Sequence, residues 1–124
     1  MIIDTSVLLA IFFKETHHAW AQEILDRPGQ DLHMSTVNLT ELLIRLKDKQ
    51  EAIFNELREK VYCFPIQFIA PDIQQAELAA EARLKYPLNL GDCFVYALAK
   101  VENSPIITLD SDFKKTDLTI IFPE

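Results

Sequence analysis

The chain has 124 residues, 49% of them hydrophobic, and a formal net charge of −7 at pH 7, so we expect one folded domain rather than a disordered chain. No apolar run approaches the roughly 20 residues of a membrane helix, and no basic segment precedes an apolar one at the start, so we expect a soluble, cytoplasmic protein. The negative charge argues against nonspecific nucleic-acid binding, although a cation at clustered acids would reverse the local sign, and two glycines are too few for a Gly-rich phosphate loop.

The first ten residues place one acid between two apolar runs. Residues 2–3 are β-branched, which favours the end of a buried strand, and a short apolar helix is expected over residues 7–14. Thr5 or Ser6 is expected to cap this helix with its side-chain oxygen. Asp4 is then expected at the carboxyl end of a strand, where open α/β sheets usually bind their ligands.

Strand and helix patterns alternate along the rest of the chain, without a linker, a repeat or a low-complexity segment. We therefore expect a single domain over residues 1–124, an α/β sandwich around a mainly parallel sheet. The elements expected after the first helix are helices over 17–26, 36–47, 48–62, 71–84 and 90–103, and strands over 32–35, 63–69, 105–109 and 118–122.

Local signals give further expectations along these elements. Thr16 is expected to cap the second helix, which would bury Ala19, and Pro71 is expected at the first position of a later helix. Cys63 and Cys93 have neither the number nor the spacing of a disulfide framework or a metal motif. Both cysteines are therefore expected as small core residues.

The helix over 36–47 carries an acid on an ambiguous face. Four leucines have the spacing of one buried face, and Asn38, Glu41 and Arg45 form a polar strip opposite them. Glu41 is explained either as a solvated acid paired with Arg45 or as an acid that lines a cleft, because the adjoining Ile44 leaves little of the helix obviously exposed.

Asp92 and Asp110 each have a structural and a functional interpretation. With Asn89 as the cap, Asp92 occupies the helical position where a carboxylate bonds back to the cap and is stabilised by the positive helix end, and a metal would use the same place. Asp110 and Asp112 follow a predicted strand, either as turn residues or as acids that meet Asp4 where two neighbouring strands end.

Four motifs fall in the order and spacing of one known family. They are Ile-Ile-Asp-Thr-Ser at the start, then Asn-Leu-Thr-Glu-Leu, Leu-Gly-Asp-Cys-Phe-Val-Tyr-Ala-Leu-Ala and Thr-Leu-Asp-Ser-Asp-Phe. Over essentially its whole length the sequence resembles PIN domains, and in length it resembles the VapC-type toxins of prokaryotic toxin–antitoxin pairs. The resemblance implies a three-layer α/β/α fold with a mainly parallel sheet of about five strands. It also implies a metal-dependent endoribonuclease that leaves a 5′-phosphate and a 3′-hydroxyl.

The resemblance further implies site residues and partners. It implies that the catalytic acids are Asp4, Glu41, Asp92 and Asp110, with Asp112 as an auxiliary or alternative to Asp110. Asp4 and Asp92 are the expected direct ligands of Mg²⁺ or Mn²⁺, which prefer oxygen donors. Glu41 is expected to orient the attacking water. RNA is the implied substrate, and a cognate antitoxin and a second copy of the chain are the implied partners.

Other side chains support these acids in the same hypothesis. Hydroxyls of Thr5, Ser6 or Thr108 are expected to hydrogen-bond the carboxylates and fix their rotamers. Three basic residues lie close in sequence to the acids and are either solvated charges or guides for a phosphate backbone. These are Arg45, Lys114 and Lys115.

Two other classes of function are weighed against the ribonuclease. A haloacid-dehalogenase-like phosphatase needs an Asp-x-Asp pattern after the first strand, whereas Asp4 is followed by Thr5 and Ser6. A non-enzymatic module would be either a receiver-like domain, whose acidic pair is missing, or a degenerate PIN-like binding domain. A degenerate domain is expected to lose an acid, and all four matching positions are acidic. The sequence therefore favours the enzyme.

Overall fold

Five parallel strands form one sheet in the order β3-β2-β1-β4-β5 in the computed structural model, which describes residues 1–124. The strands are β1 (Ile2–Ile3), β2 (Leu32–Ser35), β3 (Ile66–Ile69), β4 (Ile106–Ile107) and β5 (Ile120–Ile121). The helices are α1 (Thr5–Phe13), α2 (His18–Asp26), α3 (Thr36–Lys49), α4 (Phe54–Cys63), α5 (Ile73–Lys85) and α6 (Leu90–Glu102), with 3₁₀ turns η1 (Glu51–Ile53) and η2 (Ser111–Lys115). The predicted five-stranded α/β fold is confirmed.

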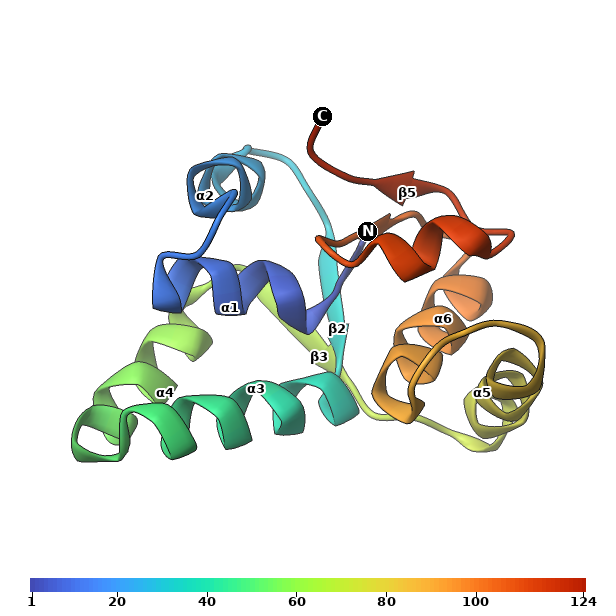
Figure 1. The fold of residues 1–124 in the computed structure, drawn as a ribbon, viewed down its shortest axis with the longest axis horizontal. Coiled ribbons are helices and arrows are strands. Elements are labelled where there is room, and N and C mark those ends of the chain that lie inside the picture. The colour runs from blue at the N-terminus through green and yellow to red at the C-terminus, as the bar shows by residue number, and fades with distance from the viewer.

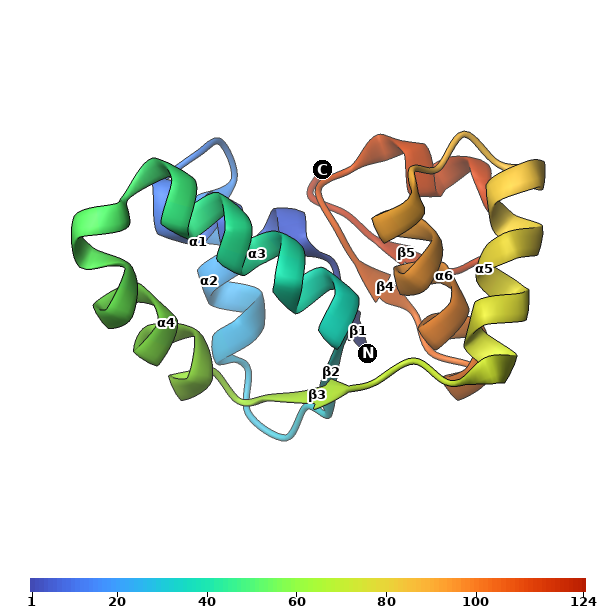
Figure 2. The same ribbon diagram turned by 90° about the horizontal axis from the view of Figure 1, so that it is seen from below.

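Helices cover both faces of the sheet, which gives three layers. Figure 1 shows α1 to α4 on one side and α5 and α6 on the other, and Figure 2 shows the same division from below. Neighbouring residues of a strand point to opposite faces. Accordingly Ile3 and Ile107 belong to the core beneath α1 to α4, and Ile2 and Ile106 belong to the core beneath α5 and α6.

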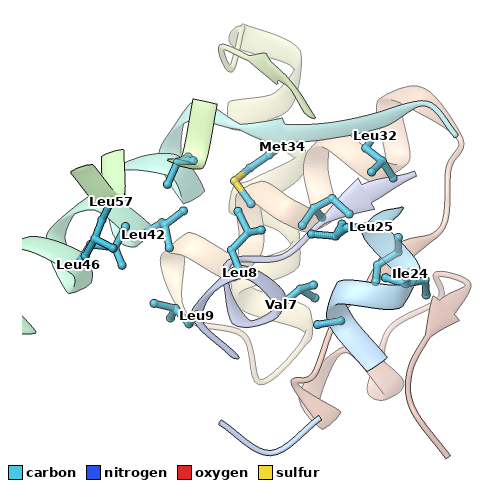
Figure 3. Close-up of a cluster of buried hydrophobic side chains, with 14 residues drawn as sticks. Val7, Leu8, Leu9, Ile24, Leu25, Leu32, Met34, Leu42, Leu46 and Leu57 are labelled. Atoms are coloured by element: carbon cyan, nitrogen blue, oxygen red, sulfur yellow. The ribbon is translucent and has the colours of Figure 1, made fainter. Parts of the chain in front are cut away.

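The core beneath α1 to α4 anchors α3, which carries Glu41, and α1, which begins directly after Asp4. Met34 of β2 projects toward Leu8 of α1, and Leu42, Leu46 and Leu57 gather between α3 and α4 (Figure 3). Complete burial of such a side chain contributes about 1.5–3 kcal/mol relative to exposure. This packing therefore fixes the positions of α1 and α3, whose N-terminal ends face the carboxyl edge of the sheet.

Helix α6 lies deepest in the second core, as its uninterrupted apolar run predicts. Every residue over 91–99 is buried except Phe94, which is partly buried. Ala79 and Ala82 of α5 and Phe113 of η2 complete the core around it. None of the helices combines the length and the apolar character of a bilayer-spanning segment.

Two predicted helix caps are wrong because the side chains bind elsewhere or the backbone turns differently. Helix α1 begins at Thr5 with Asp4 at its N-cap, and neither Thr5 nor Ser6 caps it. Helix α2 has His17 rather than Thr16 at its N-cap. The left-handed φ of 69° at His17 reverses the chain before the helix, so the Thr16 hydroxyl makes no cap.

Three other local predictions are also wrong. Ala19 is exposed, because the buried face of α2 runs through other positions of the helix. Cys63 is exposed at the end of α4, although Cys93 is buried as predicted. Pro71 precedes the helix, because the side chain of Asp72 caps α5.

The strands of the sheet are shorter than the sequence suggests. Strands β4 and β5 have two residues each where 105–109 and 118–122 were expected, and β3 begins only after Pro65, which has no N–H for the ladder. The single helix expected over 48–62 is divided: residues 48–49 end α3, and most of the rest forms η1 and α4. Short strands leave the residues that follow them free to build a pocket.

Candidate active site

Four acids from separate segments line one open pocket of about 420 Å³. Asp4 follows β1, Glu41 lies on α3, Asp92 lies in the first turn of α6, and Asp110 follows β4 as the N-cap of η2. The chain builds outward from β1 to β3 and then continues from β4 on the other side of β1. Ligands of open α/β sheets bind at such a switch point, outside the carboxyl ends of the strands. The four predicted acids therefore do meet, although their chemical roles stay a prediction.

Two hydroxyl groups hold Asp4. Ser6 Oγ donates to Asp4 Oδ2 at 2.6 Å, and Thr108 Oγ1 donates to the same oxygen at 2.8 Å. The backbone N–H groups of Leu109 and Asp110 donate to these hydroxyls and orient them. Burial raises the pKa of Asp4; the two hydroxyls oppose the shift and the neighbouring acids add to it. No group donates to Oδ1, so one oxygen is fixed and the other is available.

Glu41 is also held through only one of its carboxylate oxygens. Asn38 Nδ2 donates to Glu41 Oε1 at 2.9 Å, and Thr5 Oγ1 lies 3.4 Å from the same oxygen. Thr5 Oγ1 makes its shorter bond, 3.1 Å, to the backbone oxygen of Asn38. Glu41 forms no ion pair with Arg45. The interpretation of Glu41 as an acid lining a cleft is therefore the correct one.

Gly91 leaves room for the Glu41 carboxyl group. A Cβ atom on Gly91 would overlap that group and lie 2.6 Å from Oε1. The close approach explains why glycine, which costs about 1 kcal/mol relative to alanine inside a helix, stands here. The sequence did not identify Asn38 and Gly91 as site residues. The available signals were the three-residue spacing of Asn38 and Glu41 and a glycine inside a helix.

The carboxyl group of Asp92 has a strongly raised pKa. Burial is the largest cause that raises the pKa of Asp92 to about 7, and repulsion from the other three acids adds to it, while the backbone of Asn89 opposes it. Asn89 Oδ1 accepts a bond of 2.8 Å from the Asp92 N–H, as the predicted cap requires. No side chain donates to the Asp92 carboxylate. A carboxyl group with a pKa near neutrality is characteristic of functional sites.

The acid loop after β4 contributes one pocket residue and three that lie elsewhere. Asp110 lines the pocket, and its Oδ1 accepts a bond of 2.9 Å from the N–H of Asp112. Asp112 does not line it, and its Oδ1 lies 3.6 Å from Lys115 Nζ. Lys114 Nζ stands 3.9 Å above the ring of Phe122. Of these four residues, only Asp110 belongs to the pocket.

Arg45 is the one cationic residue that lines the acid pocket. It also lines an adjacent pocket of about 400 Å³, which shares Ser6 and Leu9 with the first and extends to His17. The two hollows therefore form a continuous surface along α1 and α3. Among the three predicted phosphate-binding residues, Arg45 alone is placed at the site.

The donors in the pocket fit a hard divalent cation. Its acidic side chains offer carboxylate oxygens, and no histidine or cysteine lines it. No three acidic, histidine or cysteine side chains converge closely enough to enclose an ion by themselves. Mg²⁺ suits such an open set, because it keeps several waters and binds through one or two carboxylates. A cation would also relieve the mutual repulsion of the acids.

Comparison with known proteins identifies the family. The PIN domain profile matches residues 1–118. Ribonuclease VapC42 of Mycobacterium tuberculosis is 33% identical over 127 residues, which cover 95% of this chain and 96% of the relative. Ribonuclease VapC of Mycolicibacterium smegmatis is 32% identical over 130 residues, which cover 98% of this chain and 99% of the relative.

Solved structures share the fold at low sequence identity. VapC20 of Mycobacterium tuberculosis, described as a sarcin-ricin loop cleaving toxin, has a TM-score of 0.82 at 15% identity and covers 98% of both chains. VapBC2 of Rickettsia felis, solved bound to a fragment of promoter DNA, has a TM-score of 0.79 at 15% identity and covers 99% of this chain and 98% of that chain. With the profile match over nearly the whole chain, these likenesses show that the chain belongs to the PIN domain family.

Proposed function

We propose that this protein is an endoribonuclease, the toxin of a toxin–antitoxin pair, and that it hydrolyses RNA phosphodiester bonds with Mg²⁺ or Mn²⁺. The observation that carries the proposal is the meeting of four carboxylates at one pocket, where burial and their repulsion raise the pKa of Asp92 to about 7. Membership of the PIN family and relatives named VapC ribonucleases support the same activity. Membership of the PIN family also argues against a haloacid-dehalogenase-like phosphatase and against a receiver-like domain.

Asp4 and Asp92 are the proposed ligands of the cation. When bound, a divalent cation supplies an activated water and neutralises charge on the scissile phosphate. Asp4 suits this role because its Oδ2 is fixed by two hydroxyls while its Oδ1 is free. Asp92 has to lose its proton before it binds, so metal affinity is expected to rise with pH through about 7.

Glu41 and Asp110 act around that centre in the proposal. Glu41 Oε2 accepts no hydrogen bond and lies against Gly91, which has no side chain to cover it, and in the proposal this oxygen orients the attacking water. Asp110 is fixed through Oδ1 by a backbone N–H, and its other oxygen is available to water around the cation. In-line attack then leaves a 5′-phosphate and a 3′-hydroxyl.

The RNA strand is proposed to run along the continuous hollow beside α1 and α3. Arg45 lines both of its parts and offers the guanidinium group that binds phosphate well. The acids repel a phosphate until a cation neutralises them, and the chain as a whole carries −7. Substrate binding is therefore expected to depend on the metal as strongly as cleavage does.

A cognate antitoxin, a homodimeric state and action in the cytoplasm complete the proposal. Solved structures with this fold include VapBC2 of Rickettsia felis and a toxin–antitoxin complex of Klebsiella pneumoniae. An open pocket of about 550 Å³, half of whose lining residues are hydrophobic, lies between α1, α2 and α4 and away from the acids. It is the proposed surface for an apolar segment of the antitoxin. Co-expression with the adjacent gene product, followed by purification as a complex, tests this part.

A metal-dependence assay tests the enzymatic proposal. The purified chain is incubated with labelled RNA in Mg²⁺, in Mn²⁺ and in excess chelator, beside the Asp4→Asn variant. Cleavage that requires the metal and disappears in Asp4→Asn supports the proposal, and mass spectrometry of the ends checks for the 5′-phosphate. Equal cleavage by Asp4→Asn would refute the assigned site. A folded chain that neither binds metal nor cleaves RNA would instead be a degenerate binding module.

A further inference from the structure

Asn38 is a completely buried residue of α3 whose amide group reaches two other parts of the site. Its Nδ2 donates to Glu41 Oε1 at 2.9 Å and to the backbone oxygen of Gly91 at 3.0 Å. Its Oδ1 has no hydrogen-bond partner, although the side chain is 0% exposed. Turning the amide over would aim Oδ1 at two acceptors, so the contacts of Nδ2 fix which way the group faces.

Gly91 meets the same carboxyl group from α6. A Cβ atom on Gly91 would overlap the Glu41 carboxyl group, whose Oε2 is the nearest atom, and would lie 2.6 Å from Oε1. The backbone gives no other reason for glycine, because only Gly29 among the glycines has a positive φ. The contact joins residues that lie 50 positions apart in sequence, so it exists only when α3 and α6 are packed together.

We propose that Asn38 and Gly91 are positioning residues for Glu41. Asn38 holds Oε1 of the carboxylate, Gly91 leaves the space in which the carboxyl group rests with Oε2 nearest to it, and Oε2 accepts no hydrogen bond. The inference rests on the proposed function, in which Glu41 acts beside Asp92. Because Gly91 directly precedes Asp92, a single turn of α6 then sets the placement of both acids.

A merely structural role makes a different prediction from a positioning role. If Asn38 and Gly91 only join α3 to α6, substitutions lower the melting temperature and the activity together. Alanine, however, favours the helix more than glycine does, and the atoms that its Cβ displaces are the flexible end of Glu41. Gly91→Ala is therefore expected to keep or slightly raise the melting temperature while it moves the carboxylate.

The experiment measures Mn²⁺ binding to the RNA-free protein by calorimetry, kcat and KM for RNA cleavage, and the melting temperature. Gly91→Ala and Asn38→Ser are each expected to lower Mn²⁺ affinity and kcat by roughly 10- to 100-fold. At saturating Mn²⁺, KM is expected to change by less than about threefold, since neither residue is placed at the RNA. Asn55→Ser, on the exposed side of α4, is the matched control and is expected to behave as the wild type.

Combining Gly91→Ala with Glu41→Gln distinguishes a failure of this inference from a failure of the proposed function. The double variant Glu41→Gln/Gly91→Ala is expected to cleave RNA no more slowly than Glu41→Gln alone, because Gly91 acts through that carboxylate. Wild-type metal binding and kcat in Gly91→Ala, beside an impaired Glu41→Gln, would overturn the inference and leave the proposed function intact. Full activity in Glu41→Gln would overturn both. If Asn38→Ser fails to fold, Gly91→Ala decides the question.

Discussion

Asp4 and Asp92 lie at the same pocket but are held in opposite ways. Asp4 follows a central strand and receives two hydroxyl donors on one oxygen. Asp92 lies in the first turn of a helix, receives no side-chain donor, and has its pKa raised to about 7 by burial and by the other acids. The sheet edge thus provides a fixed carboxylate, and the helix provides one whose charge responds to what the pocket contains. In the proposed site the fixed carboxylate of Asp4 would locate the cation, and the carboxyl group of Asp92 would ionise as the cation binds.

Replacing either acid is expected to have the largest effect on activity. Asp4→Asn and Asp92→Asn each remove a charge that the cation requires, so cleavage is expected to fall by roughly 10²- to 10³-fold. The two variants are expected to differ in stability, because Asp92→Asn removes repulsion without removing a side-chain hydrogen bond. Its metal-free melting temperature at pH 8 should exceed that of the wild type. A lower melting temperature in Asp92→Asn would show that its carboxylate is held more firmly than the contacts indicate.

Weakening the support of the fixed acid is the next largest perturbation. Thr108→Val keeps the shape of the side chain but removes the donor to Asp4 Oδ2 and the acceptor for the Asp110 N–H. Mn²⁺ affinity is expected to fall by roughly 10- to 100-fold, measured by calorimetry. Thr119→Val changes an exposed threonine whose hydroxyl makes no hydrogen bond, and it is expected to bind Mn²⁺ normally. Equal Mn²⁺ affinity in Thr108→Val and Thr119→Val would show that the hydroxyl donor to Asp4 does not support metal binding.

The pH dependence of stability tests whether the pKa of Asp92 is raised in the folded protein. Because the folded-state pKa of Asp92 is raised from 3.8 to about 7, the folded protein binds more protons than the unfolded chain across that window. The free energy of unfolding of the metal-free protein is therefore expected to fall as pH rises from about 4 to about 7. Thermal melts at half-unit pH steps measure the slope. Asp92→Asn should flatten it, and saturating Mn²⁺ should oppose it, since the metal binds the ionised form.

The smallest effect is expected at the acid outside the pocket. Asp112→Asn keeps the N–H that donates to Asp110 Oδ1 and alters only a carboxylate near Lys115. RNA cleavage is expected to stay within about threefold of the wild type, as for most surface substitutions away from a site. A loss as large as that of Asp92→Asn would move the fourth acid of the site from Asp110 to Asp112.

The acids and the sheet were predictable because their signals are local. Asp4 directly follows a β-branched strand, Asp110 follows another after two intervening residues, and the Asn89–Asp92 cap is visible as a short sequence pattern. Parallel strands place their carboxyl ends along one edge, so the meeting of Asp4 and Asp110 follows from topology. The resemblance to PIN domains added Glu41, whose own surroundings in sequence left two explanations open.

The remaining contacts were not predictable because they join distant segments. Thr5 and Ser6 look like helix caps in sequence, but Thr5 bonds to the backbone of Asn38 and Ser6 bonds to Asp4 and the N–H of Leu109. Cap preferences describe only what a local backbone offers, and a tertiary partner that needs the same hydroxyl overrides them. The exposed Cys63 shows the same limit, since its exposure depends on where α4 ends.

The order of synthesis gives the central position of β1 a further consequence. Strand β1 leaves the ribosome well before β4, yet it pairs with β4, and the hydrogen bond from Thr108 to Asp4 spans 104 residues. A nascent chain that stops before β4 contains neither Thr108 nor Asp110 and has no pocket. The four acids therefore meet only after synthesis has passed Asp110, and a chain interrupted earlier cannot assemble the proposed active site.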